Sequence, residues 1–157
     1  MLDVQGKLAR AFERAGPLLA RLRAEGAGGG PFGSDAEALA RARDILAQMS
    51  EADQIAVINA HPRIGADPRE VSAESFREQG YDRDTTPPEV YLRLARLNEE
   101  YEQKFGFRFV VFVNRRSKEA IVPVLEARLR GNRDDERRAA LDEIVAIARD
   151  RMGKERA

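Results

Sequence analysis

One histidine, His61, is the clearest candidate for acid–base chemistry in this chain of 157 residues. It stands in Ala60-His61-Pro62, directly after an apolar helical pattern, and a residue before proline is pushed out of the α-helical region. The sequence therefore predicts that His61 lies in a turn at a helix end. An imidazole titrates near neutral pH, which suits general acid–base catalysis. A lone histidine is more often structural or simply exposed, so this chemistry needs support from other residues.

A second polar group follows in Ser75-Phe76-Arg77-Glu78-Gln79. We expect a short helix here that starts at Ser72 and ends by Gly80. Ser75 and Glu78 are three residues apart and would share one helix face. A carboxylate such as Glu78 could hold a substrate hydroxyl or assist proton movement, and Gln79 offers both a donor and an acceptor. Taken alone, these side chains are better explained as a helix surface with a local cap.

The composition narrows the possible chemistry. The chain has no cysteine, which excludes thiolate nucleophiles, disulfides and cysteine-based metal sites. With one histidine, a metal site would have to be largely carboxylate, and we expect none. No lysine lies in an apolar context suited to a Schiff base. The work of a catalytic site would then fall on hydrogen-bonding groups that are held in place.

Charge and hydropathy argue against nucleic-acid-binding, membrane and secreted proteins. Lys and Arg number 27 and balance the 27 Asp and Glu residues, so no net charge attracts nucleic acid or an anionic membrane. No run approaches the roughly 20 apolar residues of a membrane span. The first seven residues lack the apolar core of a signal peptide. We expect a soluble, cytoplasmic protein that binds neither nucleic acid nor a membrane.

The hydrophobic spacing predicts an all-α protein, a single compact domain over residues 1–157 with seven to eight helices and no sheet. The glycine-rich stretch Glu25–Pro31 is expected to be a loop. The expected helices are two short ones that meet near Gly16, one from Ser34 to about Met49, one from Ser50 that delivers His61, the short one before Gly80, a long one from Pro88 to Phe105, one from Ser117 to Gly131, and a last one capped by Asp134 or Asp135.

One strand-like run, Phe107–Val113, interrupts the helical pattern. It stands alone and cannot build a sheet from this chain. We expect a buried extended segment whose backbone amides and carbonyls find partners other than a neighbouring strand.

Together these motifs resemble one family, the OHCU decarboxylases, which act on 2-oxo-4-hydroxy-4-carboxy-5-ureidoimidazoline (OHCU) on the route from uric acid to (S)-allantoin. The resemblance is strongest over residues 30–153. It is carried, in the family's order and spacing, by Ala60-His61-Pro62 with Gly65, Ser75-Phe76-Arg77-Glu78-Gln79, Leu97-Asn98-Glu99-Glu100-Tyr101, Lys104-Phe105-Gly106-Phe107-Arg108-Phe109-Val110, Ser117, Arg128-Leu129 and the tail Glu143–Arg151.

The resemblance implies a carboxy-lyase that converts OHCU to (S)-allantoin without a cofactor or metal, and a homodimer. It implies that His61 is the catalytic residue, and we expect Glu78 to assist it. It also implies that Pro62 lines the pocket and that backbone groups of Phe107–Val111 meet the ligand. The predicted substrate-binding residues are Pro62, Ser75, Gln79, Phe107, Arg108, Phe109, Val110, Val111 and Arg128.

Arg128 belongs to this set because a guanidinium fork suits a substrate carboxylate. Arg130 is the alternative, since the spacing to Asn132 is one residue longer than in the family. Arg108 stands where the family often has proline, and the family's N-terminal tryptophan is missing. A related decarboxylase with an altered substrate therefore stays open. From a different class, the alternative is a helical binding or scaffold module in which the His-Pro turn is structural.

Overall fold

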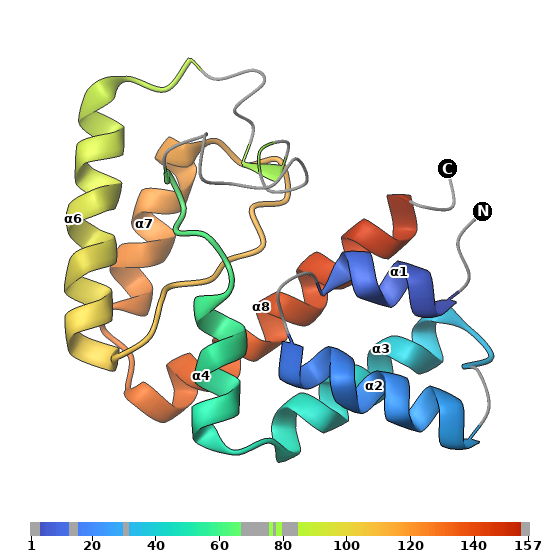
Figure 1. The fold of residues 1–157 in the computed structure, drawn as a ribbon. Coiled ribbons are helices and arrows are strands. Elements are labelled where there is room, and N and C mark those ends of the chain that lie inside the picture. The colour runs from blue at the N-terminus through green and yellow to red at the C-terminus, as the bar shows by residue number, and fades with distance from the viewer. Residues whose placement is uncertain are drawn as a thin grey trace. The chain divides into compact units, whose positions relative to one another are not determined.

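The computed structural model describes residues 4–12, 16–29, 32–66, 76, 78–79 and 85–154. These residues form seven helices and no strand (Figure 1), which confirms the all-α prediction for the described part of the chain. Two compact units are found, residues 1–60 with 141–157, and residues 61–140. The single domain over residues 1–157 stays a prediction.

The first unit is built from helices α1 to α4 and the second part of α8. Buried side chains from these helices form its core, and Arg151 of α8 donates a hydrogen bond to the carbonyl of Ala11 at 3.2 Å. Helix α2 packs against α1, α3 and α4. The bounds are Val4–Ala11 for α1, Gly16–Gly29 for α2, Asp35–Gln48 for α3, Glu51–Asn59 for α4 and Arg133–Lys154 for α8.

Serine caps start α3 and α4, as the sequence predicted. The hydroxyl of Ser34 accepts a hydrogen bond from the Glu37 amide at 3.1 Å, and that of Ser50 accepts one from the Asp53 amide at 3.1 Å. Each cap satisfies one of the amides that a helix start leaves without an intrahelical partner.

Two local predictions were wrong. Glu25–Gly29 is helical and not part of a loop. The buried side chains of Leu18 and Leu22 anchor the earlier turns of α2. Because each residue added to an existing helix gains a hydrogen bond, the helix continues through the glycines. Helix α8 is capped by Asn132, not by Asp134 or Asp135, because the side-chain oxygen of Asn132 accepts from the Asp135 amide at 2.9 Å.

The second unit contains α6 (Pro88–Phe105), α7 (Lys118–Arg128) and the first residues of α8. Helices α6 and α7 pack side by side (Figure 1). Phe107–Val113, which follows α6 in the sequence and precedes α7, is neither helix nor strand, which confirms the prediction that it pairs with no strand among the described residues. Its buried side chains are Phe107, Phe109, Val110, Val111 and Val113.

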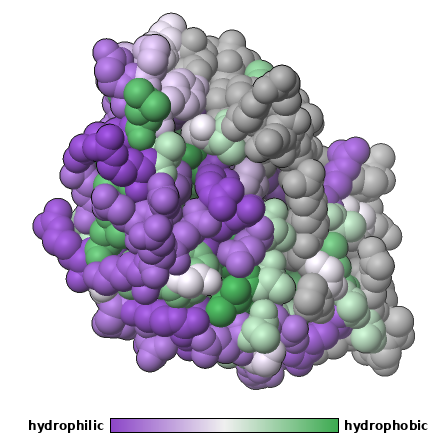
Figure 2. All heavy atoms as spheres, turned by 60° about the vertical axis from the view of Figure 1, so that its left-hand side comes forward, coloured by the Kyte–Doolittle hydropathy of each residue, from purple (hydrophilic) through white to green (hydrophobic). Residues whose placement is uncertain are grey.

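The described residues on the side that comes forward in Figure 2 are largely hydrophilic, and hydrophobic residues form small separate groups among them. Leu92 is an exposed large hydrophobic residue on α6, whereas the charged residues Arg93 and Arg96 cover the same outer face. In the described part of the chain, no helix has the length and apolar character needed to cross a membrane.

Gly106 ends α6 in the left-handed region at φ 82°. A Cβ at this position would meet no atom within 4 Å, so Gly106→Ala changes backbone strain and not packing. We expect the free energy of unfolding to fall by about 1 kcal/mol, measured by urea denaturation.

Gly153→Ala is the matched control. Gly153 lies in α8, and a Cβ there also meets nothing within 4 Å. Because alanine is the better helix former, this change should leave stability equal or raise it by up to about 1 kcal/mol. Equal losses for the two variants would contradict the role of backbone conformation at Gly106.

Candidate active site

His61 lies in a turn directly after α4, as predicted. Helix α4 ends at Asn59, and Ala60 caps it with its amide bonded to the last turn. His61 is buried, with 8% of its surface exposed. Its carbonyl accepts a hydrogen bond from Nη1 of Arg108 at 3.0 Å. The extended segment therefore fastens the backbone that carries the imidazole.

Gln79 also holds this turn. Its side-chain oxygen accepts from the Gly65 amide at 2.9 Å, and its side-chain nitrogen donates to the Arg63 carbonyl at 3.4 Å. Gly65 adopts φ 79°, a conformation that glycine reaches without steric cost. The two motifs that the sequence singled out are therefore joined by the Gln79 amide, and both ends of this amide have protein partners.

Glu78 precedes Gln79 in a helical position and is half-buried. Its predicted partner Ser75 lies outside the described residues. Pro62 is half-buried. The roles of Ser75, Glu78 and Pro62 toward a substrate stay predictions.

Lys118 is a residue that the sequence reasoning missed. It is only 3% exposed, and its ammonium donates to the Gln79 carbonyl at 2.7 Å and lies 5.6 Å from the centre of the Tyr91 ring. A lysine in the first turn of a predicted helix resembles any charged surface residue, so the sequence carried no signal for this contact.

Asn98 supports the same turn from α6. It is buried, and its side-chain nitrogen donates to the Ile64 carbonyl at 3.1 Å. The sequence indicates Asn98-x-x-Tyr101 as part of the family resemblance but gives no role to the Asn98 side chain. Spaced three residues apart, both point from one face of α6 into the second unit.

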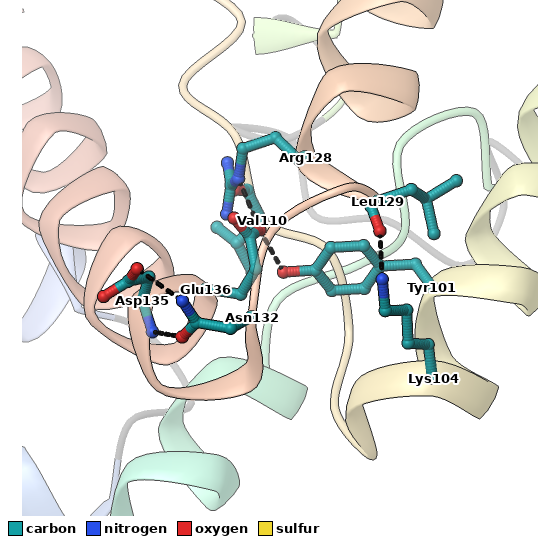
Figure 3. Close-up of polar contacts among 8 residues, drawn as sticks. All are labelled: Tyr101, Lys104, Val110, Arg128, Leu129, Asn132, Asp135 and Glu136. Carbon is teal, nitrogen blue, oxygen red and sulfur yellow. Dashed lines mark hydrogen bonds and ion pairs between the residues drawn. The ribbon is translucent and has the colours of Figure 1, made fainter.

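Arg128, the predicted carboxylate partner, is engaged within the protein (Figure 3). Its Nε donates to Glu136 at 2.6 Å and its Nη1 to the Val110 carbonyl at 3.3 Å, while its guanidinium carbon lies 5.0 Å from the centre of the Phe109 ring. The Nη2 atom is buried and has no hydrogen-bond partner among the described residues. A substrate carboxylate could therefore meet Nη2 but not a free fork. The alternative residue, Arg130, is exposed.

Glu136 accepts a second hydrogen bond, from the phenol of Tyr101 at 2.7 Å. Burial first, and then this hydrogen bond, raise the pKa of Tyr101 well above its usual range, because the site favours the neutral phenol. Tyr101 therefore stays protonated as a donor. The sequence assigns no role to Glu136, and it places Tyr101 only within a motif of the family resemblance.

Neither a metal-binding group nor a cavity adds to this site among the described residues. No group of three His, Cys, Asp or Glu side chains that could hold a metal ion occurs among them. A cavity of about 440 Å³ lies beside α6, where Arg63 and Glu102 form an ion pair at 2.7 Å. The residues that line it are Arg63, Ala95, Asn98, Glu99, Glu102 and Gln103, and none of them belongs to the predicted site.

Known proteins resemble this chain in sequence and fold. The family model described as OHCU decarboxylase matches residues 3–153. A 2-oxo-4-hydroxy-4-carboxy-5-ureidoimidazoline decarboxylase of Haloferax volcanii is 30% identical over 124 residues, 79% of this chain and 74% of that protein. A uric acid degradation bifunctional protein of Bacillus subtilis is 33% identical over 123 residues, 78% of this chain and 25% of that protein.

A solved structure of an enzyme with the same name is similar to this chain in fold. The crystal structure of an OHCU decarboxylase in the presence of (S)-allantoin has a TM-score of 0.74 and 26% identity, and the match covers 93% of this chain and 94% of that one. These findings define an all-α carboxy-lyase, an enzyme that releases carbon dioxide from a carboxylic acid. More narrowly, the chain belongs to the OHCU decarboxylase family.

Lys118→Met tests the contact that fastens Gln79. The variant leaves the buried Gln79 carbonyl without this donor, and we expect a loss of about 1–3 kcal/mol in the free energy of unfolding. The control is Arg138→Met, because the Arg138 side chain is 74% exposed in a loose 3.9 Å ion pair and should change stability by no more than about 0.5 kcal/mol. Similar values for both in urea denaturation would refute a structural role for Lys118.

Tyr101→Phe tests the raised pKa. Below the ordinary phenol pKa of about 10, folded and unfolded Tyr101 are both neutral. Above it the unfolded phenol ionises while the folded one does not, so this residue lowers the free energy of unfolding by up to about 1.4 kcal/mol per pH unit. The wild type should therefore lose stability more steeply than Tyr101→Phe between pH 10 and 11.5. Parallel curves would show that the native environment leaves this pKa unchanged.

Proposed function

We propose that this enzyme decarboxylates OHCU to (S)-allantoin without a cofactor, with His61 as the general acid–base. The observation that carries the proposal is the chain's only histidine, buried in the turn after α4 and fastened by Arg108 from the extended segment. The family membership and the fold shared with an OHCU decarboxylase crystallised in the presence of (S)-allantoin support this substrate and product.

The reaction breaks the bond between the carboxylate carbon and the ring carbon that also bears the hydroxyl. Carbon dioxide leaves, and the electron pair is taken up between that carbon and the neighbouring ureido-bearing ring carbon as an enolate-like state. Hydrogen-bond donors that already point at the developing charge stabilise such a state. A proton delivered to one face of the ureido-bearing carbon, while the hydroxyl-bearing carbon becomes a carbonyl, then gives a single enantiomer, and an imidazolium at His61 is the proposed donor.

The remaining roles follow the predictions from the sequence. Glu78 polarises the substrate's hydroxyl or ureido group or assists the proton movement. Ser75 and Gln79 contribute hydrogen bonds, with Gln79 also holding the turn after His61. Pro62 lines the pocket, and backbone groups of Phe107–Val111 meet the substrate ring.

For the substrate carboxylate we propose Arg128 before Arg130. The Arg128 guanidinium is largely buried, and its Nη2 atom still has a donor to offer. Because Nε and Nη1 are engaged, this would be a single contact to the carboxylate and not a fork.

On the resemblance alone we also propose a homodimer in the cytoplasm. Size-exclusion chromatography with light scattering measures the first directly, and a particle with the mass of one chain would contradict it.

His61→Asn tests the central role. Asparagine keeps a polar side chain of similar size but cannot donate a proton as an acid, so we expect kcat to fall by about 10²–10⁴-fold. Freshly prepared OHCU is mixed with enzyme, and optically active (S)-allantoin is followed by circular dichroism. The control Arg138→Gln alters an exposed residue and should keep wild-type activity.

Two results would go against the proposal. A wild-type rate equal to that in buffer would reject OHCU as the substrate, and turnover of a close analogue would then favour a related decarboxylase. An active His61→Asn variant would reject acid–base chemistry by His61 and favour a structural role for the His-Pro turn.

A further inference from the structure

The backbone groups of Phe107–Val113 need hydrogen-bond partners that a neighbouring strand would normally supply. The segment is largely buried, yet in the described part of the chain it is neither part of a helix nor paired with a strand. A buried carbonyl without a hydrogen-bond partner destabilises the fold by about 1–3 kcal/mol. At Val110 the partner is the guanidinium of Arg128, from the last turn of α7.

Arg128 is itself held by other residues. Glu136 at the start of α8 accepts from Arg128 Nε at 2.6 Å and from the Tyr101 phenol of α6 at 2.7 Å (Figure 3). Only 15% of the Arg128 side chain and 8% of the Glu136 side chain are exposed. A long arginine side chain is normally mobile, but here its orientation is set by a carboxylate that is anchored from a third helix.

We propose that Tyr101, Glu136 and Arg128 form a positioning cluster that sets the direction of the Phe109–Val110 backbone toward the substrate. This inference rests on the proposed function, because it assigns substrate contact to Phe107–Val111. Tyr101 and Glu136 are positioning residues that act through Arg128. Arg128 acts at two places, with Nη1 on the Val110 carbonyl and its guanidinium against the Phe109 ring.

The planarity of the peptide bond explains why one clamp is enough. In a trans peptide the carbonyl and the following N–H lie in one plane and point in opposite directions. Once the Val110 carbonyl is turned toward Arg128, the Val111 N–H of the same peptide group is therefore directed to the opposite side. A fixed carbonyl direction thus sets the direction of a donor in the segment proposed to contact the substrate.

Stability alone does not explain the cluster. Phe109 and Val110 are buried, so apolar packing already keeps the segment in the core. Buried ion pairs contribute little net stability compared with apolar residues of similar volume. What packing does not supply is a defined direction for the peptide groups, and hydrogen bonds of fixed geometry do.

Glu136→Gln and Tyr101→Phe test the proposal. The first removes the charge that holds Arg128, and the second removes one hydrogen bond to Glu136. The matched control is Arg93→Gln, which breaks an exposed ion pair with Glu126, at 2.8 Å, between α6 and α7. Amide hydrogen exchange of a peptide covering residues 107–113 reports the segment directly, and KM and kcat with OHCU report its effect on the substrate.

For Glu136→Gln we expect exchange in residues 107–113 to accelerate roughly 10- to 100-fold, while α6 and α7 keep their wild-type exchange. KM should rise by roughly tenfold with a smaller change in kcat, because the segment would lose a contact that holds the substrate equally in the ground state and the transition state. Tyr101→Phe should act in the same direction but less strongly, since Arg128 keeps its carboxylate. Arg93→Gln should change none of these values.

Unchanged exchange in residues 107–113 for Glu136→Gln would overturn the cluster's role, whatever the activity. Accelerated exchange spread equally over α6 and α7 would overturn it as well, because the cluster would then be a general stabiliser. Accelerated local exchange with wild-type KM would overturn the link to substrate. If the wild type itself fails to turn over OHCU, the proposed function fails, and the local exchange still decides whether the cluster holds the segment.

Discussion

The second unit depends on one constraint, which is that buried backbone outside its helices must still find hydrogen-bond partners. The turn after α4, Gln79 and the Phe107–Val113 segment belong to no sheet in the described chain. Long polar side chains, mostly from α6 and α7, supply the missing donors. These contacts are Arg108 on the His61 carbonyl, Asn98 on Ile64, Lys118 on Gln79 and Arg128 on Val110.

In this arrangement, charged and amide side chains in the interior donate hydrogen bonds to backbone carbonyls that have no helix or sheet partner. Burying a charge is unfavourable unless it is paired and hydrogen-bonded, and the half-buried Arg128 and the buried Glu136 meet both conditions. The neutral Tyr101 phenol adds a third anchor without adding charge. The same side chains therefore hold the segments that carry the proposed catalytic residues. Several residues of the family motifs thus have a structural role in this unit, as hydrogen-bond donors to buried carbonyls.

Much of the fold could be predicted because its signals are local. Ser34 and Ser50 cap the helices that the sequence assigned to them, and Gly106 ends α6. The two wrong predictions concern helix ends, where adjacent residues offer alternative caps or stop signals. Asn132 and not the following aspartates caps α8, and Glu25–Gly29 continues a helix despite its glycines. Lys118 and Glu136 could not be predicted as interior residues, since their types are those of a solvated helix surface.

By itself the sequence determined the helical class, the turn that carries His61, the unpaired extended segment and the absence of cysteine chemistry. These follow from periodicity, caps, proline and composition, all of which act over a few residues. Only the tertiary structure decided which side chain satisfies which carbonyl, and that Arg128 is half-buried while Arg130 is exposed. The physical reason is separation along the chain. The partners Lys118 and Gln79 lie 39 residues apart, and Arg108 and His61 lie 47 apart, so no local pattern records that they meet.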